Sequence, residues 1–119
     1  MACARGTAFV RFAAIVEYAT HPPTLRCRGD EDRATQALRR QALARALKAH
    51  CDVLVDLAEL SWADTSLMLD FVTLARRLRV RGHALVLRDP QPQITALLEL
   101  VGLDRVPDVR IERAEPAYV

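Results

Sequence analysis

Aromatic residues are scarce in this sequence. They make up 5% of the 119 residues, with one tryptophan, two tyrosines and three phenylalanines. Proteins that bind single-stranded nucleic acid stack the bases on aromatic rings, and so few rings offer no such platform. Charge of one sign is in equally small excess, because 17 lysines and arginines stand against 15 acidic residues, a net charge of +2. A charge of this size gives no argument for direct contact with nucleic acid or with a membrane.

Long hydrophobic runs are also missing. The N-terminal segment MACARGTAFVRFAAIVEY is interrupted by Arg5, Arg11 and Glu17, so it lacks the continuous apolar stretch of a signal peptide. No segment approaches the length of about 20 apolar residues that crosses a membrane. We therefore expect a cytoplasmic protein that is not inserted in a membrane.

The motifs of metal sites and of common enzymes are absent. The three cysteines, Cys3, Cys27 and Cys51, form no CxxC pair, and we expect all of them to be buried thiols in a reducing compartment. The histidines stand singly at the boundaries of predicted elements, and there is no HExxH, GxGxxG, GxxxxGK[ST] or GxSxG motif. The sequence thus predicts no metal, no cofactor and no catalytic residue, so a non-enzymatic protein is expected.

Alternating hydrophobic residues predict the strands. Residues 8–18 alternate, and HisProPro at 21–23 ends this strand before a second one at 24–28, whose inward residues are Leu25 and Cys27. We expect the two to form a hairpin or neighbouring strands. Further strands are predicted at 51–57, 84–88 and 109–113. The segment 51–57 lacks clean alternation, which is typical of a strand covered on both faces.

Helical spacing predicts three helices, over residues 29–50, 65–81 and 89–102. In the first, the leucines and alanines face inward and the arginines between them face water. The second has an inward stripe of Leu67, Met68, Phe71, Leu74, Ala75 and Leu78, and the third has Ile94, Leu97, Leu98 and Val101. Strands that alternate with helices indicate an α/β sheet, and neither a repeat nor a linker divides the chain. We expect one domain over residues 1–119.

The tripeptide Asp64-Thr65-Ser66 stands where a strand gives way to the second helix. Such residues are preferred helix N-caps, and from spacing alone a cap is the better interpretation. The carboxyl edge of an α/β sheet is nevertheless where ligands usually bind. A helix N-terminus also tolerates an anion, so a phosphate on either hydroxyl is compatible with the cap.

Several motifs resemble the STAS domain of bacterial anti-sigma factor antagonists. The segments are VDLAELSWADTS, LARRLRVRGHALVL and LLELVGLDRV, with GDEDRAT at 29–35 in place of the "GELDLAT" of that family. The resemblance covers about residues 8–113. It implies a mixed sheet of four or five strands with helices packed mainly on one face.

The resemblance also implies a role in partner switching. Antagonists of this family bind an anti-sigma factor, commonly a serine kinase, and so release a sigma factor for transcription. Phosphorylation of the hydroxyl after the aspartate of the motif abolishes binding, and a phosphatase restores it. By this resemblance Thr65 is the phospho-acceptor with Ser66 as the alternative, and the partner-binding residues are Asp30, Asp32, Asp64, Thr65, Ser66 and Leu67. We add Leu69 to the partner-binding residues from its position on the second helix.

Three departures from the family pattern matter. Thr65 replaces the commoner serine, Leu67 replaces a glycine that lets a partner approach, and Glu31 replaces an apolar residue. Leu69 and Val80 project opposite the inward stripe of the second helix, and Leu69 lies one turn from Thr65. The alternative function is a STAS subunit of a larger assembly, of the stressosome or lipid-transport kind, which binds a partner or ligand without phosphorylation. A homodimer is left open.

Overall fold

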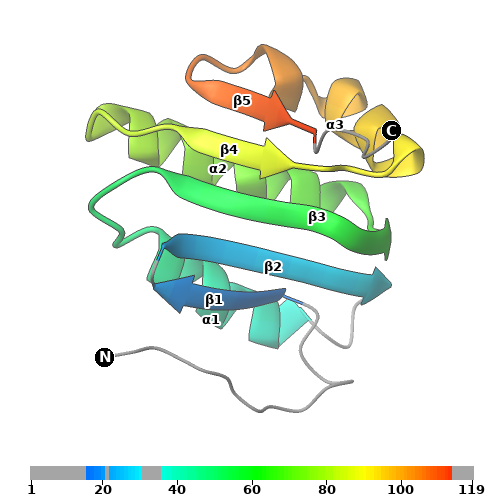
Figure 1. The fold of residues 1–119 in the computed structure, drawn as a ribbon, viewed down its shortest axis with the longest axis horizontal. Helices are drawn as coiled ribbons and strands as arrows, with labels where there is room; N and C mark the ends of the chain where they lie inside the picture. The colour runs from blue at the N-terminus through cyan, green and yellow to red at the C-terminus, as the bar shows by residue number, and fades with distance from the viewer. Residues whose placement is uncertain (1–15, 21, 31–35, 114–119) are drawn as a thin grey trace, which may run out of the picture.

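The computed structural model describes residues 16–20, 22–30 and 36–113 (Figure 1). These residues follow the predicted order of elements: β1 (Val16–Thr20), β2 (Pro23–Asp30), α1 (Gln36–Ala46), β3 (Val53–Trp62), α2 (Thr65–Val80), β4 (Leu85–Arg88), α3 (Pro92–Val101), the short 3-10 helix η2 (Leu103–Arg105) and β5 (Val109–Glu112). The predicted strand at 8–15 and residues 31–35 of the predicted first helix lie outside the described residues. Gly29 and Asp30, which the prediction placed at the start of that helix, are instead the last residues of β2, and the helix ends at Ala46 rather than at residue 50.

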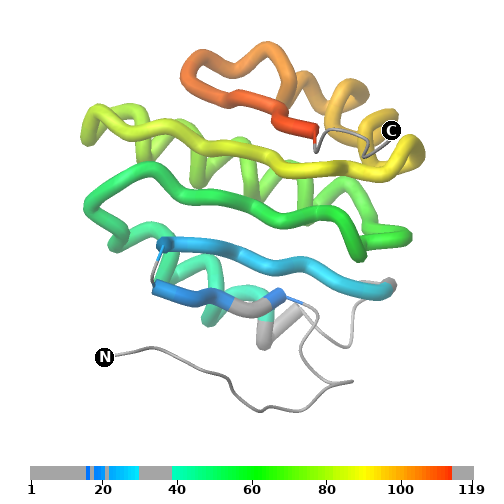
Figure 2. The backbone as a smooth tube through the Cα atoms, in the orientation of Figure 1, coloured from blue at the N-terminus to red at the C-terminus, as the bar shows by residue number. Residues whose placement is uncertain are grey.

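The strands form one mixed sheet in the order β1-β2-β3-β4-β5. β1 and β2 are an antiparallel hairpin, whereas β2, β3, β4 and β5 pair in parallel. Figure 2 shows this sequential order as colours that run from blue at one edge of the sheet to red at the other. The mixed five-stranded sheet confirms the predicted fold class.

The helices cover one face of the sheet and bury the core against it (Figure 1). The residues of α2 that are buried are those of the predicted inward stripe, from Leu67 to Leu78. Burying a leucine or phenylalanine side chain contributes about 1.5–3 kcal/mol. This stripe is therefore sufficient to fix which side of α2 faces the sheet and which side is left in solvent.

Among the described residues, no helix covers the opposite face of the sheet, and charged side chains line it. Arg26, Asp56, Arg88 and Glu112 are aligned by the register of four neighbouring strands, so that positive and negative residues alternate across the sheet. Opposite charges on directly paired residues stabilise a sheet. The prediction that β3 is covered on both faces is wrong, because Leu54 and Asp56 on this open face are only partly buried.

Strand β3 is longer than predicted, since it continues past Leu57 to Trp62. β2 follows it over this length through two register shifts, at Arg26/Arg28 and at Gly29/Asp30. Gly29 has a φ of +71°, which favours glycine, and its carbonyl oxygen accepts a hydrogen bond from the Ser61 hydroxyl at 3.2 Å. The extended pairing carries the chain to the carboxyl edge of the sheet immediately before Asp64.

The structure also tests the predictions about the end of α3 and the burial of the cysteines. α3 ends at Gly102, whose φ of +81° is the left-handed conformation typical of a helix C-terminus. Cys27 is buried as expected, but Cys51 is exposed, because it lies in the turn between α1 and β3 rather than inside the strand. Among the described residues, no helix is long and apolar enough to cross a membrane, and no cluster of metal-ligating side chains is found.

Candidate functional site

The candidate site is the N-terminus of α2, where Asp64 is the N-cap residue. Its side chain accepts hydrogen bonds from the backbone N–H groups of Ser66 at 3.1 Å and Leu67 at 3.4 Å. These are two of the N–H groups that a helix cannot satisfy within itself. The predicted cap is therefore present, and it fixes where both neighbouring hydroxyl groups lie.

The two hydroxyls have different environments. The Ser66 hydroxyl is partly buried, donates a hydrogen bond to Asp64 Oδ1 at 2.5 Å and accepts one from Arg39 Nη2 at 3.3 Å. The Thr65 side chain is exposed, and its hydroxyl makes no hydrogen bond to any residue that the structure describes. Ser66 is thus held in place by its neighbours, whereas the oxygen of Thr65 is accessible to another protein.

Arg39 links α1 to this site. Its side chain is only 5% exposed, and its Nε lies 3.1 Å from Asp70 Oδ2 on α2. The prediction that every arginine of this helix faces water is therefore wrong for Arg39. The sequence does hold the signal, because Arg39 precedes the buried Leu43 and Ala46 by four and seven residues and so shares their side of α1.

The two carboxyl groups of the site are shifted in opposite directions. The hydrogen bond from the Ser66 hydroxyl lowers the pKa of Asp64 below its usual value, and the Leu67 amide and the Arg39 charge act in the same direction. Burial raises the pKa of Asp70, although the charge of Arg39 partly offsets that effect. The folded structure therefore stabilises the ionised form of Asp64 and destabilises the ionised form of Asp70.

Replacing Asp64 with alanine is expected to lower the free energy of unfolding by about 1 kcal/mol, because the N-cap acceptor is lost. A group whose pKa is lowered by folding stabilises the protein above its unfolded pKa, and this contribution disappears as the pH falls through the folded pKa. The loss in Asp64→Ala should therefore be full at neutral pH and shrink below about pH 4. Urea denaturation at a series of pH values measures it.

Asp64→Asn is the matched control, because asparagine caps a helix but carries no charge. It should keep most of the stability at neutral pH and lose only the part that depends on pH. A stability of Asp64→Ala equal to that of the wild type would show that the cap contributes nothing.

The structure places the remaining predicted residues as follows. Leu69 is 52% exposed, as its position on α2 predicts, whereas Leu67 is fully buried. The Leu67 side chain fills the core beneath the helix start, as its place on the predicted inward stripe requires, and the role of this position in partner binding stays a prediction. Asp30 is the last residue of β2 and pairs in register with Trp62, so its backbone lies at the same edge of the sheet as Asp64. Asp32 lies outside the described residues.

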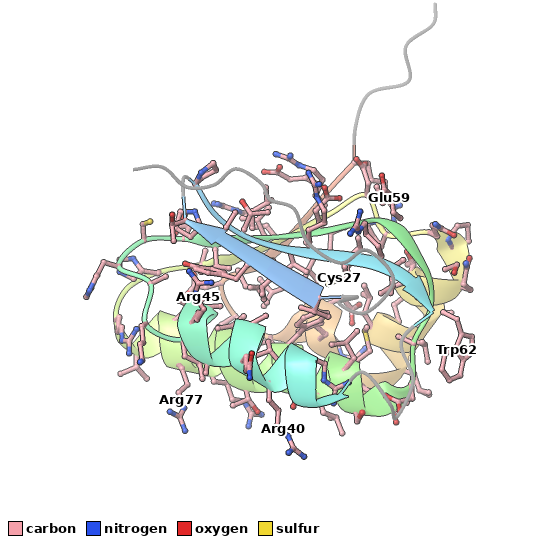
Figure 3. The ribbon with its side chains drawn as sticks, turned by 90° about the horizontal axis from the view of Figure 1, so that it is seen from below. Cys27, Arg40, Arg45, Glu59, Trp62 and Arg77 are labelled. Atoms are coloured by element: carbon pink, nitrogen blue, oxygen red, sulfur yellow. The ribbon has the colours of Figure 1, made fainter. Side chains whose placement is uncertain are left out.

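Trp62 is a surface residue that the sequence analysis did not single out. It is 52% exposed and stands two residues before Asp64, at the end of β3. Figure 3 shows its ring projecting from that end of the molecule. A large exposed aromatic side chain three residues before Thr65 suits a partner contact, since tryptophan is enriched in interface hot spots.

A separate hollow of about 500 Å³ lies near the opposite end of β3. It is open to solvent and is lined by Tyr18, Thr20, Pro23, Arg45, Lys48, Ala49, His50 and Cys51. The guanidinium of Arg45 sits over the Tyr18 ring, 5.4 Å from its centre. Ligands of α/β sheets bind outside the carboxyl ends of the strands, and this hollow is at the other end.

Comparison with known proteins assigns the family. The family model described as "Mlab, STAS domain" matches residues 16–111. Among solved structures, the chain is similar to the anti-sigma factor antagonist SpoIIAA in its unphosphorylated form, with a TM-score of 0.64 and 18% sequence identity, over 78% of this chain and 79% of that one. No curated protein sequence matches. The family match covers most of the chain and the solved structure has the same fold, so this chain belongs to the STAS domain family.

Proposed function

We propose that this chain is an anti-sigma factor antagonist, a non-enzymatic module that binds an anti-sigma factor kinase in the cytoplasm. Phosphorylation of Thr65 switches it off, and a phosphatase restores it. The observation that carries this proposal is the contrast between the exposed Thr65 hydroxyl and the Ser66 hydroxyl, which is held between Asp64 and Arg39. The likeness of the fold to an anti-sigma factor antagonist supports it.

The position of Thr65 suits a phosphate. Thr65 is the first residue of α2, where the positive end of the helix dipole favours a negative charge. A phosphate adds nearly two negative charges at pH 7, and like charges placed across an interface repel a partner strongly. One modification can therefore change partner affinity without changing the fold.

The proposal predicts one phosphate per chain, on Thr65. Each histidine-kinase-like serine kinase of the same genome is incubated with the protein and ATP, and the modified residue is identified by mass spectrometry. The cognate kinase should modify the wild type fully and should leave Thr65→Ala unmodified.

Ser66→Ala is the matched control, because it removes the neighbouring hydroxyl and leaves Thr65 exposed. It should accept phosphate as the wild type does. Equal phosphorylation of Thr65→Ala and the wild type would refute the assignment of the site and would point to Ser66.

The second candidate function is a STAS subunit of a larger complex that binds its partner or ligand without phosphorylation. The buried Leu67 favours it, since this residue stands where the resemblance to the antagonists calls for a glycine. Such a subunit would bind its partner irrespective of charge at position 65. The two candidates are therefore separated by a charged substitution at Thr65.

A further inference from the structure

One exposed line of residues on α2 begins at Thr65. Residues spaced by three or four positions share one side of a helix, and the α2 outer stripe defined in this way consists of Thr65, Leu69, Thr73, Arg76 and Val80, all exposed. Leu69 is 52% exposed and Val80 is 88% exposed. The candidate acceptor thus stands at one end of a surface that combines apolar side chains with an arginine.

The charged residues of α1 and α2 are nearly all positive. α1 and α2 together contain six arginines, no lysine and a single acidic residue, Asp70. The whole chain has a net charge of only +2, so the rest of it is net acidic. Ordinary surfaces intersperse both signs, and this concentration of positive charge therefore distinguishes α1 and α2 from the rest of the chain.

Half of these arginines already have a partner within the fold. Arg39 pairs with Asp70, Arg79 lies 3.2 Å from Asp108, and Arg45 covers the Tyr18 ring. Arg40, Arg76 and Arg77 are exposed and form no ion pair with any described residue. Figure 3 shows Arg40 and Arg77 pointing away from the sheet, on the outer side of the helices.

We propose that the α2 outer stripe, together with Arg40 and Arg77, is a docking surface for an acidic patch on a protein partner. This inference rests on the proposed function and adds to it the chemistry of the partner. Arginine is suited to the role, because its planar guanidinium binds carboxylates through two parallel hydrogen bonds. Leu69 and Val80 supply the apolar contacts that a protein interface also requires.

A protein fits this surface better than nucleic acid does. The described residues of α1 and α2 that are exposed include no aromatic side chain on which a base could stack. The exposed leucine and valine match apolar side chains of a protein rather than the charged backbone of a duplex.

An acidic partner also explains the sign of the proposed switch. Thr65 and Arg76 are separated by about 16 Å along the helix axis, which exceeds the screening length of about 8–10 Å in physiological salt. A phosphate on Thr65 therefore does not neutralise Arg76. A partner whose acidic surface extends along the whole α2 outer stripe, from Arg76 to Thr65, is instead repelled at short range by that phosphate.

Titration with polyglutamate tests the surface without any assumption about Thr65. Amide NMR shifts of the labelled protein should move on α2 and around Arg40, and Arg76→Gln/Arg77→Gln should weaken binding about tenfold, as expected for the loss of two charges at low salt. The matched control is Arg26→Gln/Arg88→Gln on the open sheet face, which should change affinity less than about twofold.

Four outcomes of these binding measurements would overturn the inference. They are no binding of polyglutamate, equal weakening by the control pair, tighter binding of duplex DNA at the same ionic strength, and capture by phosphatidylglycerol vesicles. The kinase that modifies Thr65 supplies a second measurement, in which Arg76→Gln/Arg77→Gln should raise KM with kcat unchanged. An unchanged KM would refute the docking surface and leave the phosphorylation site standing, whereas the lack of any such kinase would refute the proposed function alone.

Discussion

Replacing Arg39 with methionine is expected to lower the free energy of unfolding by about 2–3 kcal/mol, because Asp70 loses its ion-pair partner and the Ser66 hydroxyl loses the hydrogen bond that it accepts from Arg39. Removing one member of a buried ion pair costs about 3–5 kcal/mol, and the value is smaller here since the Asp70 side chain is 40% exposed. Methionine keeps the aliphatic part of the side chain, so that the measurement reports the lost charge rather than lost packing. Urea denaturation followed by fluorescence of Trp62, the single tryptophan, measures the change.

Arg40→Met is the control, because Arg40 is the next residue and is exposed. It should change stability by less than about 0.5 kcal/mol. The effect of Arg39→Met should also diminish with acid: losing Arg39 raises the already elevated pKa of Asp70 further, so protonation of Asp70 on folding restores stability as the pH falls. A loss of the same size for Arg40→Met, or a loss independent of pH, would contradict the role assigned to Arg39.

Replacing Thr65 with glutamate is expected to weaken binding of the kinase that modifies it by at least about 30-fold. The substitution places a fixed negative charge at the first residue of α2, and like charges in contact across an interface cost several kcal/mol. Isothermal titration calorimetry of the purified pair gives the affinity. The protein should remain folded, since an acidic residue in the first turn of a helix is favourable.

Thr65→Gln is the matched variant, with the shape of glutamate but no charge. It should bind within a few-fold of the wild type, which would show that charge rather than size controls the partner. Equal affinity of Thr65→Glu and the wild type would instead favour the subunit of a larger complex, which has no phosphorylation switch.

The fold could be predicted from the sequence where a local pattern decides the structure. The spacing of the apolar residues of α2 predicts its inward stripe. Asp64 predicts where α2 begins, and Gly102 predicts where α3 ends. The length of β3 could not be predicted, because residues 58–62 are held in the sheet by pairing with β2 rather than by their own pattern. Long-range pairing of this kind leaves no local signature.

The candidate site was only partly predictable for the same reason. The sequence shows that Asp64 begins a helix, but it does not show which of the two following hydroxyls is accessible. That depends on Arg39, which lies 27 positions away from Ser66 in the chain. The difference in environment between the Thr65 and Ser66 hydroxyl groups thus depends on tertiary structure, because the packing of α1 against α2 brings Arg39 to Ser66.

The sequential strand order has a consequence for how the protein forms during synthesis. Each strand after β1 pairs with the strand that precedes it in the chain, so each strand–helix unit that leaves the ribosome can add to an edge that already exists. No late strand has to insert between earlier ones, and loop closure stays short at every step. The N-terminal end of α2 can therefore meet Arg39 before β4 and β5 have been translated.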